Sequence, residues 1–523
     1  MRYLIFILLF PFLIQAQTIT LTDADIKAFP TAEGHGENAP SAGTKTPYFL
    51  TSLGNSGGGT LRDAFSGDNR VIIPRVAGTI ELSSDITTSS KNIHFAGQTA
   101  PGDGLAIHGG AFVIQNGSDI TMRHLRFRDG DPGIGSGQDA LRLLNTANST
   151  SMNDFMFDHV SISWGDDENL GIGSGPSGSN RDIERFTLQN SIVSECFEGN
   201  KGILLYHNTY ELSFIRNLLA HQNERNIRAS TDTSTFEMIN NVIYHFGAGT
   251  QPTTQNTHDI VGNIYLDGPG TATNVIKLEA CTTNCDPDIT SGSGTSYHIS
   301  DNKFNGGSIP ALNSRYGQGT SSGSRVMASN YTPLSSSVVL DSVLGNAGAR
   351  ANLLDGNDAL DLHMFADVLN GNAGSYVDSE SQTTGLPTLS SGTAYTDTDS
   401  DGLSDAYETD NGGSVTASTR PATAVISNGT TIDQSGVTSY ASLGYTHLDI
   451  FLADMANDWD YFEVDGAPSP TCSDGIQNGD ETGVDCGGSC SACPEPEPST
   501  YKRVKIKGKA YIGGSPVQVY ITE

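Results

Sequence analysis

Three basic side chains lie close together in a chain that is otherwise strongly acidic. Lys201 opens the run K-G-I-L-L, and Arg225 and Arg228 lie three residues apart in N-E-R-N-I-R. Lys201 and Arg225 are 24 residues apart, which matches a local sequence repeat described below, so we expect both on one face. Grouped cations bind carboxylates. They predict a site that binds an anionic sugar and helps to remove a proton from it; surface arginines on a turn are the alternative.

Four acidic residues near these cations are candidate ligands for a cation. Asp139 precedes one strand-like segment, and Asp166, Asp167 and Glu168 follow another, D-F-M-F-D-H-V-S-I-S-W. If successive repeats stack, these carboxylates fall on neighbouring layers and can converge on one hard cation such as Ca²⁺. A solvated acidic turn is the alternative, because the spacing follows no established ligand pattern.

A second acidic motif has the spacing of a calcium-binding loop. Oxygen-bearing side chains occupy positions 1, 3, 5, 9 and 12, and Gly402 occupies position 6. A short loop with this spacing wraps Ca²⁺. The motif predicts a structural calcium site far from the catalytic residues, with a solvated turn as the alternative; its ligands are Asp397, Asp399, Asp401, Asp405 and Glu408.

An irregular repeat runs from about residue 71 to residue 304. Each unit is an alternating apolar strand with an Asn, Asp or His near its end, and successive units are 22 to 39 residues apart. Units too short to bury a core of their own indicate a solenoid. The strand content and the Gly/Asn/Ser turns predict an all-β parallel β-helix with an internal ladder of stacked side chains; a β-sandwich is the alternative. The predicted ladder positions are His124, His159, Asn190, Asn217, Asn241, Asn263 and Asn302.

The composition restricts the partners and the compartment. The formal net charge of −31 excludes nucleic acid as a partner. Between Arg181 and Ser230, however, six Lys/Arg balance six Asp/Glu, so the site region is locally neutral. Residues 1–16 read as a secretory signal, with a buried core helix as the alternative. No later segment is apolar enough for a membrane span. We expect a secreted monomer, extracellular or at the cell surface.

The chain is predicted to have five parts. They are the signal peptide 1–16, a β-helix domain 17–350, a region 351–465 with helices and the calcium loop, a Cys-rich module 466–493, and a Pro/Glu linker with a basic tail 494–523. Helices are predicted at 357–370 and 445–459. Two disulfides are predicted in the Cys-rich module, with a zinc site as the alternative. Cys281 and Cys285 are predicted to close a small loop, and Cys196 to be a buried thiol.

Several motifs in order resemble the pectate lyases of polysaccharide lyase family one. The similarity covers roughly residues 51–247 and begins with N-S-G-G-G-T-L-R-D-A and I-H-F-A-G-Q-T-A-P-G-D-G. F-D-H-V-S-I-S-W, K-G-I-L-L and N-E-R-N-I-R resemble the family's calcium, lysine and arginine motifs. D-A-L-D-L-H-M-F-A-D-V-L-N-G and D-T-D-S-D-G-L-S-D-A-Y-E resemble the tail of a bacterial and fungal branch.

The resemblance implies a right-handed parallel β-helix that cleaves an anionic plant or algal polysaccharide by β-elimination. Arg225 is then the base, and Lys201 contacts the substrate carboxylate. Asp139 and Asp167 hold the catalytic Ca²⁺.

The sequence departs from the family pattern at three positions. Ile227 stands where the family usually has Pro, and Ser230 where it has a second Arg, whose role Arg228 can take. Gly171 replaces a calcium-binding acid, so Asp166 or Glu168 must compensate. A β-helix polygalacturonan hydrolase and a non-catalytic polysaccharide-binding β-helix are the two alternative functions.

Overall fold

The structure is a computed structural model that describes residues 17–461 and two short strands further on. Within 17–461 it leaves out 131–137, 148–149, 175–180, 198, 231–233, 270–271, 273, 281–293, 352, 354–355, 373–375 and 439–443. Residues Thr20–Tyr461 form one compact unit, which contains all of the candidate site residues. Separately, β31 (Ala510–Ile512) and β32 (Ser515–Val517) form an antiparallel pair.

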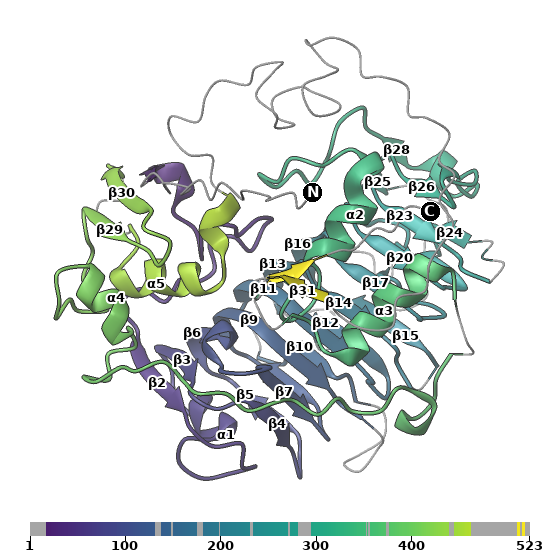
Figure 1. The fold of residues 1–523 in the computed structure, drawn as a ribbon. Helices are drawn as coiled ribbons and strands as arrows, with labels where there is room; N and C mark the ends of the chain where they lie inside the picture. The colour runs from purple at the N-terminus through teal and green to yellow at the C-terminus, as the bar shows by residue number, and fades with distance from the viewer. Residues whose placement is uncertain are drawn as a thin grey trace, which may run out of the picture. The chain divides into compact units, whose positions relative to one another are not determined.

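The core of this unit is a parallel β-helix, as predicted, in which each coil contributes one strand to each of three parallel sheets (Figure 1). The long strands β9 (Ser118–Arg128) and β11 (Met152–Ser163) bend at His124 and His159, whose φ values are 56° and 50°, and so run through the first and second sheets. Parallel pairing buries both ends of each strand's ladder, so only the outward side chains of a coil are available for chemistry.

The three sheets have these members. The first contains, besides the first halves of β9 and β11, β2 (Thr46–Leu50), β3 (Arg70–Pro74), β6 (Lys91–Ala96), β13 (Ile183–Gln189), β16 (Thr209–Ile215), β19 (Thr235–Ile239), β22 (Thr257–Val261), β25 (Ser296–Ser300) and β28 (Thr320–Ser321). The second contains, besides the second halves, β4 (Gly78–Glu81), β7 (Leu105–His108), β14 (Ile192–Ser194), β17 (Leu218–Ala220), β20 (Val242–Tyr244), β23 (Ile264–Leu266), β26 (Lys303–Phe304) and, antiparallel, β27 (Gly307–Ser308). The third contains β5 (Ile86–Thr88), β8 (Phe112–Gln115), β10 (Leu141–Asn145), β12 (Glu168–Ser174), β15 (Lys201–Tyr206) and β18 (Arg228–Ala229), followed by the pair β21 (Ala248–Thr250) and β24 (Asn274–Ile276).

An asparagine ladder runs along the bend between the first and second sheets. The side-chain amide of Asn217 donates to Asn241 Oδ1 at 3.0 Å, that of Asn241 to Asn263 at 3.0 Å, and that of Asn263 to Asn302 at 2.9 Å. Each of these amides is buried and also bonds to backbone groups, so the ladder satisfies polar groups that the bend takes out of the strand pattern.

The predicted ladder is wrong by one residue in its first three members. The strand register aligns His159 with Asn190, and Asn190 with Arg216 rather than with Asn217. The ladder position next to Asn190 is Ser191, whose backbone N–H donates to Asn217 Oδ1 at 2.9 Å. His124, His159 and Asn190 occupy the preceding left-handed position of the bend, which polar residues adopt most readily.

Replacing Asn241 by Ala should lower the stability of the folded unit. The change removes an acceptor for Asn217 and a donor to Asn263, and leaves buried groups without partners, which costs about 3 kcal/mol. The midpoint of urea denaturation should fall accordingly. Asn370→Ala, at the exposed end of a helix, is the control and should change stability by less than about 0.5 kcal/mol. Equal midpoints for the two variants would contradict a stabilising ladder.

Helices lie outside the coils. The predicted helix at 357–370 is α3 (Ala359–Asn370), where Asp358 caps the first turn and Gly371 (φ 64°) ends it. Arg126 Nε, from β9, lies 2.8 Å from Asp358 Oδ2 and fixes this end of α3 on the coil. The predicted helix at 445–459 is α5 (His447–Met455). The sequence analysis missed α2 (Ser336–Asn346), in which three serines interrupt the apolar face.

The remaining described elements are short. They are α1 (Leu61–Ala64), α4 (Asp405–Asp410), β1 (Thr18–Thr22), β29 (Thr423–Val425), β30 (Thr431–Gly436) and the 3₁₀ turns η1 (Asp23–Asp25), η2 (Gly97–Thr99), η3 (Tyr316–Gln318), η4 (Glu380–Gln382) and η5 (Asp458–Tyr461). None of the helices in the described part of the chain has both the length and the apolar run that crossing a bilayer requires. The predicted signal segment, the Cys281/Cys285 loop, the Cys-rich module and most of 494–523 lie outside the described residues.

Candidate active site

Lys201 and Arg225 lie on neighbouring coils at the start of the third sheet. In the strand register Lys201 pairs with Glu168 on the preceding coil and bridges to Glu224 on the following one, directly before Arg225. Lys201 Nζ lies 2.5 Å from Asp167 Oδ1, and the Arg225 guanidinium forms an ion pair with Glu168. The two cations therefore address the same acidic group, as the 24-residue spacing predicts.

Three of the four predicted acids come together beside these cations. Ligand oxygens of Asp139, Asp167 and Glu168 all lie within 4.8 Å of one another. Asp139 and Glu168 are buried, and the backbone N–H of Glu168 donates to Asp139 Oδ1 at 3.2 Å. Asp166 is not in this group: it is buried near Asp129, whose pKa is raised to about 7 by burial and by the Asp166 charge.

The electrostatics of Asp139 indicate that this group needs a cation. Burial raises the pKa of Asp139 to about 7, although the Arg142 guanidinium lowers it. A carboxyl group with that pKa is only partly ionised near neutral pH unless positive charge is added beside it. Three converging carboxylates, one of them this reluctant to ionise, match the donor set of Ca²⁺, which prefers oxygen ligands.

The turn that carries Arg225 has an uncommon backbone. Arg225 and Ile227 have φ values of 62° and 65°, in the left-handed region, which is costly for a β-branched residue such as isoleucine. The Ile227 side chain is fully buried in the core. The Asn226 amide donates to Gln222 O and to Ala248 O, both at 3.0 Å, and so fixes the turn from both sides. Strain of this kind is typical of functional sites.

The surroundings of Arg225 make its guanidinium easier to deprotonate. Burial lowers the pKa of Arg225, and the nearby Arg228 guanidinium lowers it further. Arg228 lies in β18 on the outer face of the third sheet, where its NH2 group is 3.3 Å from Glu279 Oε2. Arg228 thus extends the row of cations by one more residue.

The sequence analysis missed a fourth cation at this site, Arg142. Arg142 Nε lies 3.5 Å from Asp139 Oδ2, and the same group donates to the Tyr206 hydroxyl at 3.0 Å. The signal was present in the sequence, because Arg142 lies three residues after Asp139 and at an outward position of an alternating strand. The register aligns Arg142 with Gly171 of the next coil.

Gly171 leaves room for the carboxylate of Asp139. A Cβ atom at this position would lie 2.0 Å from Asp139 Oδ2, far inside contact distance. The replacement of the family's acid by glycine therefore has a structural counterpart: the side chain of Asp139 occupies the space that a side chain at 171 would need.

Replacing Gly171 by Ala should displace the Asp139 carboxylate and weaken calcium binding about tenfold or more, the range found when groups supporting a metal site are disturbed. Calorimetric titration with Ca²⁺ measures this change. Gly58→Ala is the matched control, because a Cβ at Gly58 meets nothing within 4 Å. Unchanged calcium affinity in Gly171→Ala would show that Asp139 is not a ligand.

The second predicted calcium site is partly assembled. Ligand oxygens of Asp397, Asp399 and Asp401 lie within 4.8 Å of one another, and the buried Asp397 Oδ1 has no hydrogen-bond partner. The pKa of Glu408 is raised by burial and by the surrounding aspartates. Asp405 instead accepts hydrogen bonds from the backbone N–H and hydroxyl of Thr398, both at 2.8 Å, and closes the loop.

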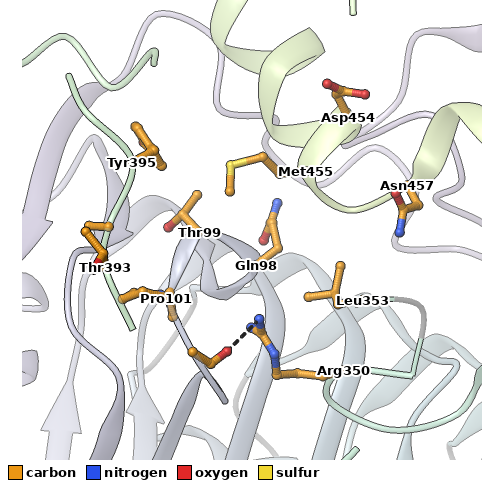
Figure 2. A pocket seen from close by; sticks show the side chains of 13 residues that line it. Gln98, Thr99, Pro101, Arg350, Leu353, Thr393, Tyr395, Asp454, Met455 and Asn457 are labelled. Carbon is orange, nitrogen blue, oxygen red and sulfur yellow. Dashed lines mark hydrogen bonds between the residues drawn. The ribbon is translucent and has the colours of Figure 1, made fainter. Parts of the chain in front are cut away.

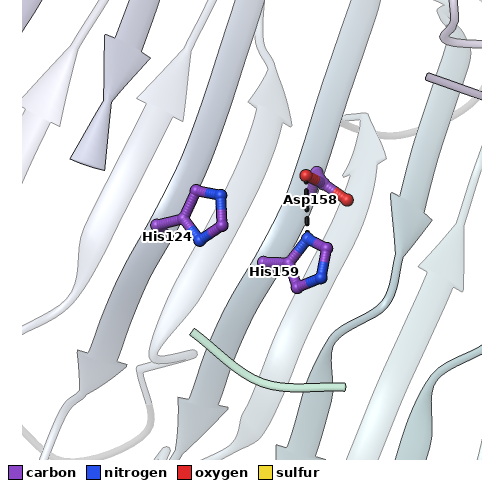
Figure 3. Close-up of side chains that lie close together, drawn as sticks. All are labelled: His124, Asp158 and His159. Atoms are coloured by element: carbon purple, nitrogen blue, oxygen red, sulfur yellow. Dashed lines mark ion pairs between the residues drawn. The ribbon is translucent and has the colours of Figure 1, made fainter. Parts of the chain in front are cut away.

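A third group of potential ligands is a packing feature. His124, Asp158 and His159 lie together under the segment 347–350, with the two rings stacked at 5.0 Å (Figure 3). Arg123 donates to Asp158 Oδ2 at 2.7 Å, and His124 Nδ1 lies 2.9 Å from Ala349 O. Burial alone would raise the pKa of Asp158, but His159 and Arg123 hold it well below the ordinary value. A carboxylate already neutralised by a buried guanidinium is a poor metal ligand.

A hollow of about 520 Å³ lies away from the cations. It is bordered by the η2 turn, the segment 393–395 and the end of α5 (Figure 2). Arg350 is buried at one side of it and donates to Gly102 O at 3.2 Å. None of the predicted site residues lines this hollow, so the candidate site is an open face of the third sheet rather than this cavity.

Comparison with known proteins identifies the family. No protein-family model matches the chain. A protein of Aspergillus fumigatus named "Probable pectate lyase C" is 31% identical over 417 residues, which cover 76% of this chain and 90% of that protein. Its counterpart in Aspergillus flavus is also 31% identical, over 77% of this chain and 91% of that protein.

Similar solved structures include a thermostable pectate lyase, with a TM-score of 0.44 and 13% identity over 62% of this chain and 97% of that one. Jun a 1, the major allergen from cedar pollen, has a TM-score of 0.45 and 15% identity over 61% of this chain and 92% of that one. Because relatives at 31% identity are matched along nine-tenths of their length, this chain belongs to the pectate lyase family of polysaccharide lyases.

Proposed function

We propose that the chain is a secreted, calcium-dependent lyase that cleaves polygalacturonate or a related uronan by β-elimination. The observation that carries the proposal is the juxtaposition of Lys201, Arg225 and three converging carboxylates on neighbouring coils. The named relatives support the same reaction. A hydrolase needs a pair of carboxyl groups in acid and base roles, whereas here Asp167 and Glu168 are each paired with a cation.

The described residues fit a calcium ion. Asp139, Asp167 and Glu168 would hold it, since they supply oxygen ligands only and since burial keeps the pKa of Asp139 at about 7 until positive charge is added. Bound there, Ca²⁺ would neutralise the substrate's carboxylate and so acidify the proton on the neighbouring carbon.

The cations of the chain then divide the work. Lys201 Nζ, half-buried at the edge of the acidic group, binds the substrate carboxylate and stabilises the negative charge that develops when the C5 proton leaves. Arg225 takes that proton, which requires its neutral form; burial and the charge of Arg228 both lower its pKa. Arg228, one position further along the third sheet, binds the next anionic sugar unit.

The direct test is to incubate the full chain with polygalacturonate, with and without a calcium chelator. Lyase action creates a carbon–carbon double bond conjugated to the carboxylate, so ultraviolet absorbance should rise in Ca²⁺ and stop in chelator. New reducing ends without that absorbance would indicate hydrolysis. Neither product, together with retention of the protein on immobilised polygalacturonate, would indicate a non-catalytic binding protein.

A further inference from the structure

A cluster of histidines and carboxylates lies on the far side of the turns that carry the active site. Glu195, His221, His363 and Asp367 line a cavity of about 220 Å³ between the end of the second sheet and α3. Glu195 and His221 are equivalent positions on neighbouring coils, whereas His363 and Asp367 lie four residues apart on one face of α3. The predicted calcium chemistry uses none of these residues.

The distances within this cluster match those between ligands of one metal ion. Asp367 Oδ2 lies 3.2 Å from His221 Nε2 and 3.5 Å from His363 Nε2. Ligands of a tetrahedral ion at bond lengths near 2.0 to 2.1 Å are about 3.3 Å apart. His221 is more than nine-tenths buried, yet its Nε2 has no well-aligned hydrogen-bond partner. An imidazole nitrogen of that kind, aimed into a cavity beside a carboxylate, is a ligand in waiting.

The other nitrogen of His221 is fixed as it is in metal sites. His221 Nδ1 lies 2.9 Å from Nδ1 of His245, which is buried and stacked at 4.5 Å on Tyr376. Burial and the neighbouring His221 lower the pKa of His245 to about 4, so His245 is neutral and can accept a hydrogen bond. When His221 donates through Nδ1, its Nε2 carries a lone pair toward Asp367, and such a second bond commonly orients metal-binding histidines.

We propose that His221, His363 and Asp367, with Glu195 beside them, form a binding site for a transition-metal ion of the Zn²⁺ class. Two imidazoles and a carboxylate suit Zn²⁺ and its neighbours, whereas Ca²⁺ prefers oxygen alone. The ion joins α3 to two coils at once. Glu195 lies six residues before Lys201, and His221 lies four residues before Arg225, so the site anchors both turns that present the catalytic cations. The proposal does not depend on the reaction proposed above.

The test is calorimetric titration of the full chain with Zn²⁺ in buffer that contains saturating Ca²⁺, which occupies the oxygen-only sites. The key variant is His363→Ala, because this side chain is 39% exposed and its loss should not impair folding. Wild-type protein should bind one more equivalent of Zn²⁺ than His363→Ala, and His245→Ala should bind it about 10- to 100-fold more weakly. His298→Ala, which changes a half-buried histidine on the first sheet, is the matched control and should bind like wild type.

Titration with Co²⁺ separates this site from the cysteine tract. Nitrogen and oxygen ligands give visible absorption without the near-ultraviolet charge-transfer band of thiolates, and the visible signal should be lost in His363→Ala. Three results would overturn the proposal: no zinc binding by wild type, equal binding by His363→Ala, or a cobalt spectrum with thiolate bands only. Zinc should also raise the melting temperature of wild type, but not of His363→Ala, by about 5 °C at saturation.

Discussion

Replacing Arg225 by Ala should abolish turnover while the fold stays intact. A positioned general base typically contributes 10²- to 10⁴-fold, so we expect kcat to fall by about 10³-fold or more. The side chain lies outside the hydrophobic core and pairs only with surface carboxylates, so melting temperature and circular dichroism should be close to those of wild type. The rate is measured as ultraviolet absorbance released from polygalacturonate in saturating Ca²⁺.

Two comparisons make this result specific to position 225. Arg185→Ala removes an arginine of a neighbouring coil, paired with Asp154 at 2.7 Å, and should leave the rate unchanged. Arg225→Lys keeps the charge but loses the guanidinium and should also be slow, since a merely electrostatic role would be served by lysine. More than a few per cent of wild-type activity in Arg225→Ala would remove this residue from the mechanism.

The same reasoning assigns Arg228 a second, smaller effect on the pH profile. Because the Arg228 charge lowers the pKa of Arg225, its removal should move the rising limb of the pH–rate profile to higher pH. Loss of affinity without such a movement would limit Arg228 to substrate binding.

The sequence was sufficient to predict the coils and the pairing of Lys201 with Arg225. Both depend on a repeat, and within the third sheet successive coils keep a nearly constant length, so residues 24 apart align. The ladder was harder. Asn190 and Asn217 are chemically alike, but a left-handed residue at the bend shifts the register by one, and sequence alone does not show which of two polar neighbours takes that conformation.

Side-chain direction in the acidic turn was likewise beyond sequence. Asp166, Asp167 and Glu168 are consecutive, and each was an equal candidate for the metal. The left-handed Trp164 (φ 66°) sets where the turn begins, so Asp167 and Glu168 face Asp139 while Asp166 faces Asp129. The His221 cluster was invisible for another reason: its members come from coils and from α3, about 140 residues apart in the chain.

Calcium should stabilise the protein far more at pH 8 than at pH 5. Burial raises the folded-state pKa of Asp139 to about 7, and burial with Asp166 does the same for Asp129. In the unfolded chain an aspartate has a pKa near 3.9. Between pH 4 and pH 7 the folded state therefore binds protons that the unfolded state does not.

The sign of the effect follows from that difference. Stability falls as pH rises wherever the folded state binds more protons. Without calcium, the melting temperature should therefore drop between pH 5 and pH 8, when Asp139 must ionise in a buried site. Added Ca²⁺ supplies the missing positive charge and should restore the stability at pH 8. At pH 5 protons already occupy the same group, so calcium should add little through this site.

Two variants divide this effect between the two calcium sites. Asp139→Asn removes the buried charge, so in chelator at pH 8 it should melt at a higher temperature than wild type and should lose the pH-dependent response to calcium. Asp399→Asn, in the loop 397–408, should keep that response, because its ligands lie in a separate group. The measurement is a set of melting curves for the three proteins in Ca²⁺ and in chelator at both pH values. An equal calcium-induced rise at pH 5 and pH 8 in wild type would mean that Asp139 does not hold the ion, and the catalytic calcium would then have to be sought at the acidic loop.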